Sequence, residues 1–191
     1  MQKSFFMKEP ISASLKLVSL ITLNQKQLKD AISFAIHEYL TTQKIIILVS
    51  LSTPFEEIQK MIPQEAKNKV FVIDCFSNRQ ITQNNVIFAG SPSELTNIQV
   101  GIETIEKQMP GEKVIIFDAL NVMAVYNNPN ELGRFFHLLT NKMMLKGNTT
   151  IILNSKDATE EEILSMIKSF CDKSYDYSDM IINSITQIMC E

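Results

Sequence analysis

Short apolar runs alternate along the chain with longer segments in which hydrophobic residues recur every three or four positions. The clearest run is Val114–Phe117, which follows a Pro110-Gly111 turn and is closed by a single carboxylate, Asp118. Such a run is typical of a central parallel strand that is buried on both faces. Because ligands of open α/β sheets bind at the carboxyl ends of the strands, Asp118 is a candidate site residue.

Further strands are expected wherever β-branched and other apolar residues follow one another. They are residues 15–23, 44–51, 70–73, 86–89 and 149–153, with edge strands, in a hairpin arrangement, at 173–177 and 180–189.

Helices are expected between these strands. Residues 25–41 carry apolar side chains at i, i+3, i+4 and i+7 (Leu28, Ala31, Ile32 and Ala35), which is one stripe of an amphipathic helix. Ser52 or Thr53 is expected to cap the next helix with its hydroxyl group. The remaining helices are predicted at residues 52–62, 91–108, 131–146 and 158–170.

This alternation predicts an α/β fold, a three-layer α/β/α sandwich around a mostly parallel sheet with edge strands at the C-terminus. No linker divides the chain, so residues 1–191 are predicted to form one domain, with residues 1–13 as a flexible lead-in. Hydrophobic residues make up 45% of the 191 residues, which is enough for a sizeable core.

Charge and cysteine content narrow the functional classes. The net charge is −3 and no stretch concentrates Lys or Arg, so direct nucleic-acid binding is not expected. The three cysteines are widely spaced without a CxxC pair, which argues against a metal site and fits a reducing cytoplasm. No signal peptide and no membrane span is recognisable, and we expect a cytoplasmic protein.

Four segments in order carry a family resemblance. They are LKLVSLITL with the helix after it, KIIILVSLSTPFEEIQKM, VIFAGSPSELTNIQVGIETI, and KVIIFDAL followed by RFFHLLTNKMMLKGNTTIIL. Together they resemble the RecA-like ATPases of the KaiC and RadA type, a branch of the P-loop NTPase superfamily common in archaea. The resemblance covers about residues 12–180 and implies a RecA-like sheet, in which KVIIFDAL corresponds to the Walker B strand.

The chain departs from this family where ATP would bind. A Walker A loop, G-x-x-x-x-G-K-[ST], needs glycines so that backbone N–H groups can curl around the phosphates. Here the matching residues 21–28 contain no glycine, and the first glycine of the chain is Gly90. Leu51-Ser52 stands where the family places a catalytic glutamate. The Walker A motif is therefore degenerate, and we predict no catalytic residue and no ATP hydrolysis.

Four polar residues remain candidates for a degenerate nucleotide cleft. Asp118 matches the Walker B aspartate by position, and its alternative role is structural, bonded to nearby hydroxyl or backbone groups. Lys26 is either a displaced phosphate-binding lysine or a surface residue in the first turn of a helix. Asn121 and Asn154 complete the set. No cofactor is expected, and ATP with Mg²⁺ enters only if this cleft binds a nucleotide.

The resemblance and its departures together predict a catalytically inactive RecA-like domain that acts as a regulatory or protein-interaction module. RecA-like domains pack against one another with the nucleotide cleft at the interface, so the expected partner is a second copy or an active paralogue. One alternative is a nucleotide- or small-molecule-binding protein that uses the degenerate cleft. Another is an accessory protein of an active RecA-like ATPase in DNA repair or signalling.

Overall fold

A computed structural model describes residues 18–77 and 85–179 of the chain. The predicted lead-in at residues 1–13 and the predicted strand at residues 180–189 lie outside the described residues.

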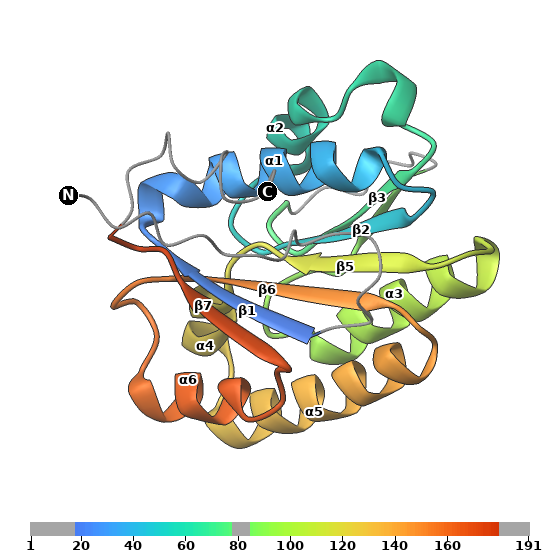
Figure 1. The fold of residues 1–191 in the computed structure, drawn as a ribbon. Helices are drawn as coiled ribbons and strands as arrows, with labels where there is room; N and C mark the ends of the chain where they lie inside the picture. Colours follow the sequence, from blue (N-terminus) through green and yellow to red (C-terminus); the bar gives the residue numbers. More distant parts are fainter. Residues whose placement is uncertain (1–17, 78–84, 180–191) are drawn as a thin grey trace.

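One parallel sheet of seven strands forms the centre of the structure (Figure 1). Its order is β4-β3-β2-β5-β6-β1-β7, and every neighbouring pair is parallel. The strands are β1 (Val18–Leu23), β2 (Ile45–Ser50), β3 (Val70–Asp74), β4 (Val86–Phe88), β5 (Lys113–Phe117), β6 (Thr149–Ser155) and β7 (Lys173–Asp176).

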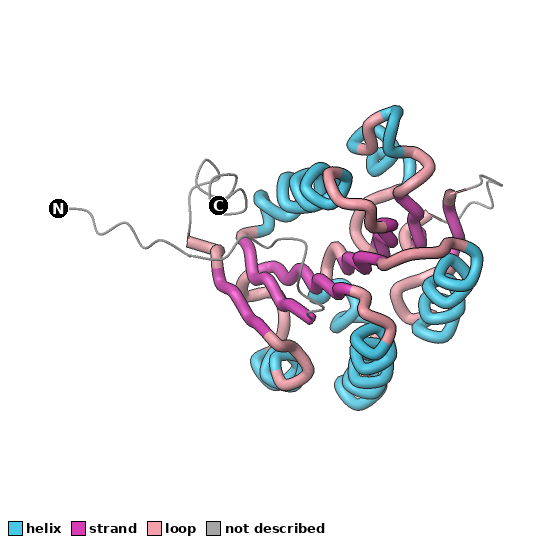
Figure 2. Tube along the Cα trace, turned by 45° about the vertical axis from the view of Figure 1, so that its right-hand side comes forward, coloured by secondary structure: helices cyan, strands magenta, loops and turns pink. Residues whose placement is uncertain are grey.

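Helices cover both faces of the sheet (Figures 1 and 2). One face carries α1 (Leu28–Leu40) and α2 (Phe55–Met61), with short 3-10 turns at η1 (Gln25–Gln27) and η2 (Gln64–Ala66). The other face carries α3 (Leu95–Gln108), α4 (Leu120–Tyr126), α5 (Pro129–Leu145) and α6 (Glu161–Lys168). The three-layer α/β/α prediction is confirmed.

Strand β5 shows how the alternation of side chains fills both cores. Val114 and Ile116 point toward α1 and α2, whereas Ile115 and Phe117 point toward α3 to α6, and all four are fully buried. The Phe117 ring packs edge-on against Phe136 of α5, with ring centroids 5.1 Å apart. A strand that is apolar on both sides therefore occupies the middle of the sheet, as its sequence predicts.

One local prediction was wrong, and one helix was not predicted. No hydroxyl group caps α2, since Pro54 occupies the N-cap position and makes no side-chain hydrogen bond there. Residues 119–126, for which no element was predicted, include a two-turn helix, α4. The edge strand at residues 173–177 is present as β7, but it runs parallel to β1.

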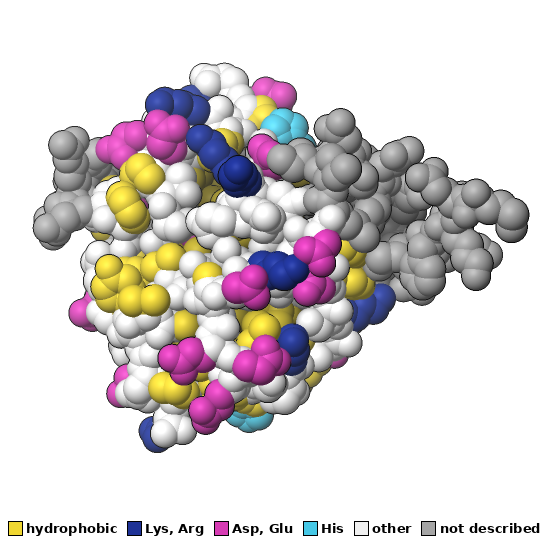
Figure 3. Space-filling model, turned by 90° about the vertical axis from the view of Figure 1, so that its left-hand side faces the viewer, with side chains coloured by type: hydrophobic (Ala, Val, Ile, Leu, Met, Phe, Trp, Pro, Cys, Tyr) yellow, Lys and Arg dark blue, Asp and Glu magenta, His cyan; other side chains and the backbone are white. Residues whose placement is uncertain are grey.

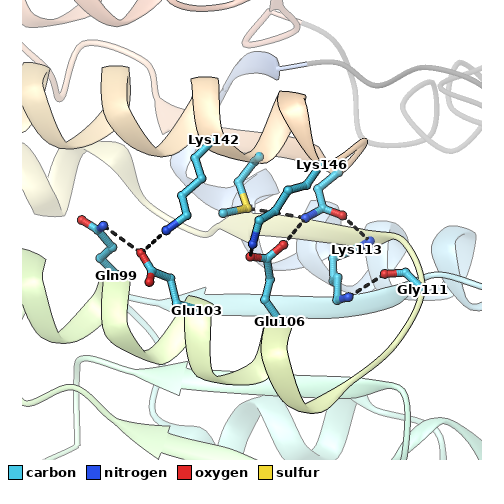
Figure 4. Close-up of polar contacts among 9 residues, drawn as sticks. Gln99, Glu103, Glu106, Gly111, Lys113, Lys142 and Lys146 are labelled. Carbon is cyan, nitrogen blue, oxygen red and sulfur yellow. Dashed lines mark hydrogen bonds and ion pairs between the residues drawn. The ribbon is translucent and has the colours of Figure 1, made fainter.

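Polar contacts tie α3 to α5 at the end of the sheet where β5 begins (Figure 4). Glu106 of α3 accepts hydrogen bonds from Lys146 Nζ and, at 2.6 Å, from Asn148 Nδ2. Asn148 Oδ1 in turn accepts from the backbone N–H of Lys113, the first residue of β5, at 2.9 Å. The Glu106 side chain is only 4% exposed, so its loss takes the carboxylate acceptor away from the buried Asn148 amide.

Replacing Glu106 with alanine is expected to lower the free energy of unfolding by about 2 kcal/mol, because a buried donor loses its partner. Glu103 offers a matched control one turn earlier. It pairs with Lys142 of α5 at 2.5 Å but is 24% exposed, and its replacement by alanine is expected to cost about 0.5 kcal/mol. Urea unfolding followed by circular dichroism measures both, and equal losses would contradict this assignment.

Candidate functional site

Polar groups gather at the edge of the sheet where the carboxyl ends of β2, β5 and β3 meet. Ser50 ends β2, Asp74 ends β3, and Asp118 directly follows β5. Since the strands are parallel and adjacent, these residues lie at one edge, from which the loops to α2 and α4 depart. Asp118 and Asp74 are both fully buried.

Asp118 holds the loop that leaves β2. Its Oδ1 accepts a hydrogen bond from the backbone N–H of Leu51 at 2.8 Å. Its Oδ2 accepts from the hydroxyl groups of Ser52 at 3.1 Å and Ser50 at 3.3 Å, and from the Ser52 N–H at 3.4 Å. Burial raises the pKa of Asp118 to about 6, although these hydrogen bonds oppose the shift.

Asp74 likewise accepts hydrogen bonds from the backbone of the loop after β3 and from the start of α2. Its Oδ1 accepts hydrogen bonds from the N–H groups of Phe76 and Ser77, each at 2.8 Å. Its Oδ2 accepts from the N–H of Phe55, the first residue of α2, at 3.3 Å. The first backbone N–H of α2 is therefore hydrogen-bonded to the Asp74 carboxylate of the neighbouring strand. Ser52 does not cap the helix, because its hydroxyl group is bonded to Asp118.

The turn after β1, where the resemblance places the phosphate loop, is closed by its own side chains. Asn24 Oδ1 accepts from the Lys26 N–H at 3.1 Å, and Gln27 Oε1 accepts from the Asn24 N–H at 2.7 Å. This reciprocal pair is a capping box at the start of η1. Lys26 itself is exposed to solvent.

The four candidate residues are only partly brought together. Lys26 follows β1, which β6 separates from β5 and Asp118. Asn154 of β6 is buried, and its Oδ1 accepts from Thr159 Oγ1 at 2.6 Å. Asn121, in the first turn of α4, lines a cleft.

This cleft has a volume of about 680 Å³ and lies above the carboxyl ends of β2 and β3, beside α4. We call it the strand-end cleft. It is lined by Leu51, Ser52, Cys75, Phe76, Gly90, Ser91, Pro92, Asn121, Val122, Val125, Tyr126 and Ala158.

Two features of the strand-end cleft bear on its chemistry. Asn121 Oδ1 is buried and has no hydrogen-bond partner among the described residues. Burial, with the carboxylates of Asp118 and Asp74 nearby, raises the pKa of the Cys75 thiol far above its usual range. The thiol is therefore neutral at physiological pH and is a poor nucleophile.

Sequence reasoning missed the apolar half of this cleft. Phe76, Val125 and Tyr126 are 55%, 78% and 57% exposed, although hydrophobic residues of this size are more often buried. The signal available was the segment Ala119–Val125, which has more apolar residues than one face of a short helix can bury. Figure 3 shows the molecule from the side at which the strands end, and hydrophobic side chains gather in the left half of this view.

Comparisons with known proteins agree on the fold. No protein-family profile and no curated protein matches the chain in sequence. Two solved structures from Pyrococcus horikoshii are similar in three dimensions. The uncharacterized protein PH0321, solved in complex with an unknown peptide, has a TM-score of 0.60 at 11% identity, over 85% of this chain and 78% of its own.

The second is the KaiC-like protein PH0186, with a TM-score of 0.53 at 12% identity, over 87% of this chain and 74% of its own. The chain therefore has the RecA-like fold that its four segments resemble. In residues 18–77 and 85–179, no helix has the length and apolar character needed to cross a membrane.

The raised pKa of Asp118 predicts a pH dependence of stability. Because the carboxyl group binds its proton more tightly in the folded protein, it favours folding at acidic pH and loses that contribution as pH rises from about 4 to about 6. A change from 3.8 to about 6 corresponds to about 3 kcal/mol.

Asp118→Asn removes this titration while keeping the shape of the side chain. As the pH rises from 4 to 7, the wild type is therefore expected to lose about 3 kcal/mol of unfolding free energy relative to Asp118→Asn. Chemical unfolding at a series of pH values measures it. A difference that stays constant with pH would show that Asp118 is ionised throughout.

Proposed function

We propose that this chain is a RecA-like domain that does not hydrolyse ATP and that acts by binding a partner protein at the carboxyl-end edge of its sheet. The observation that carries the first half is the closed turn after β1. A helix start binds phosphate through N–H groups that are free to point at the anion. Here the N–H groups of Asn24 and Lys26 are engaged by the side chains of Gln27 and Asn24.

The state of Asp118 supports the same conclusion. An aspartate that positions Mg²⁺ has to present an ionised oxygen to the ion. Both oxygens of Asp118 accept from groups of Ser50, Leu51 and Ser52, and the side chain is fully buried. If Asp118 bound Mg²⁺, the loop after β2 would lose the carboxylate that accepts its hydrogen bonds.

Partner binding is supported by the apolar side chains around the strand-end cleft. An exposed apolar cluster on a soluble domain is typical of an interaction site. The structural neighbour PH0321 was solved with a peptide bound, which adds a precedent for peptide binding by a protein of similar fold. The partner we propose is another protein chain, either a second copy or an active RecA-like paralogue, and this chain would then regulate it.

A small-molecule site is the second candidate, because a cleft of about 680 Å³ lies within the range of ligand pockets. Nucleotides fit this cleft poorly, since the described residues that line it include no cationic side chain to neutralise phosphate.

Calorimetry with MgATP tests the proposal on the purified full chain. We expect no binding heat up to millimolar ATP and no phosphate release, for wild type and for Lys26→Ala alike. Saturable micromolar binding that Asp118→Ala abolishes would overturn the proposal, because the glycine-free turn would then hold phosphate after all.

A further inference from the structure

We propose that the loop between β2 and α2, residues 51–54, forms a proton-controlled gate between the strand-end cleft and the buried carboxylate of Asp118. The gate stays closed while Asp118 is protonated and opens more readily once Asp118 is ionised. This inference goes beyond the proposed function, because it concerns one wall of the cleft and does not depend on what binds there.

The loop belongs both to the cleft and to the surroundings of Asp118. Ser52 lines the cleft, and its Oγ donates a hydrogen bond to Asp118 Oδ2 at 3.1 Å. Leu51 lines the cleft as well, and its N–H donates to Asp118 Oδ1 at 2.8 Å. The carboxylate itself is fully buried. An outward movement of these two residues would therefore open the carboxylate to water in the cleft.

The negative charge of Asp118 has no cationic partner among the described residues. Its hydrogen-bond donors are the backbone N–H groups of Leu51 and Ser52 and the hydroxyl groups of Ser50 and Ser52. A fully buried carboxylate that is held only by neutral donors is costly to ionise, because these donors replace its hydration incompletely. Contact with water in the cleft would lower this cost.

Strand β3 supplies the ionisable groups nearest to Asp118. They are the carboxylate of Asp74 and the thiol of Cys75, and the charges of Asp118 and Asp74 both help to raise the pKa of that thiol. The thiol is therefore neutral wherever the gate operates. Neither group offers a positive charge that would hold Asp118 in its ionised form.

The other segments around Asp118 carry no ionisable side chain: residues 51–55, 119–125 and 152–155. Charged residues farther along the neighbouring elements are engaged elsewhere. Glu57 of α2 pairs with Lys60 at 2.6 Å. Lys156, after β6, pairs with Asp179 at 2.7 Å. Asp118 is therefore the group whose titration we expect to control the gate.

The direction of the gate follows from proton linkage. In the closed state, burial raises the pKa of Asp118 from 3.8 to about 6. Once the gate is open, water hydrates the carboxylate and its pKa returns toward the ordinary value. The closed state therefore binds the proton more tightly, so acidic pH favours closure and rising pH favours opening.

Hydrogen exchange of the Leu51 amide, followed by NMR on the ¹⁵N-labelled full chain, tests this inference. After correction for the intrinsic exchange rate, the open population is expected to rise about tenfold from pH 5 to pH 7.5. Dilute urea should leave this exchange unchanged, because a local opening exposes little surface. Asp118→Asn should abolish the pH dependence, since its side chain does not titrate.

Two serine variants provide a matched comparison that keeps Asp118. Ser52→Ala removes a hydrogen bond that closes the gate, so the Leu51 amide should exchange about fivefold faster at pH 7.5. Ser91→Ala also removes a hydroxyl group from the cleft lining, but this hydroxyl bonds to Ser93 at 2.7 Å and not to Asp118. Its exchange rate at Leu51 should equal that of wild type.

Four outcomes would overturn the inference. They are a corrected exchange rate at Leu51 that does not change with pH, a rate that falls as pH rises, a rate that increases with dilute urea as global unfolding requires, and equal rates in Ser52→Ala and Ser91→Ala. If Asp118→Asn does not fold, the wild-type pH profile and the two serine variants still decide the matter. Circular dichroism of each variant shows whether the fold is retained.

Discussion

The buried carboxylate of Asp118 is the interaction on which the functional edge of the sheet depends. It lies at the end of β5, the central strand, and accepts hydrogen bonds from groups of three consecutive residues that leave β2. Breaking these contacts would leave a charge or several donors unsatisfied in the interior, which is a large cost for a domain of this size. The path of the chain from β2 toward α2 is set by this arrangement, and so is one wall of the strand-end cleft.

The same arrangement is the basis for our proposal that this edge does not bind phosphate. A carboxylate whose oxygens are bonded to the protein is unavailable to a metal ion, and the turn after β1 has a capping box where free N–H groups would be needed. What remains at the edge is a cleft whose described lining residues are uncharged and partly apolar. The fold therefore keeps the usual location of an α/β ligand site, while the chemistry of that location suits a neutral partner.

Much of the fold is predictable from local pattern. The run Val114–Phe117 identifies the central strand, and Leu28, Ala31, Ile32 and Ala35 identify the buried stripe of α1, because both patterns depend on short-range periodicity. Helix α4 escaped prediction because its residues are apolar on nearly every side, which hides the helical period. Ser52 was assigned to a helix cap because its actual partner, Asp118, is distant in sequence.

The candidate site was harder to predict, because its composition depends on strand order. Lys26, Asn154 and Asp118 all follow or end strands, and the sequence alone permits them to meet. In the sheet, β6 lies between β1 and β5, and Asn154 is engaged by Thr159. Asn121 was among the predicted polar groups of the cleft, but the exposed Val125 and Tyr126 near it become significant only once the cleft is seen.

The most direct test of the account is a titration of the ¹⁵N-labelled full chain with MgATP, followed through the backbone amide signals in NMR spectra. The account predicts that the amides of residues 24–28 and of Leu51 and Ser52 keep their chemical shifts up to millimolar nucleotide. Saturable shifts confined to those residues would contradict it, because they would place a phosphate group at the turn after β1 and a metal ion at Asp118.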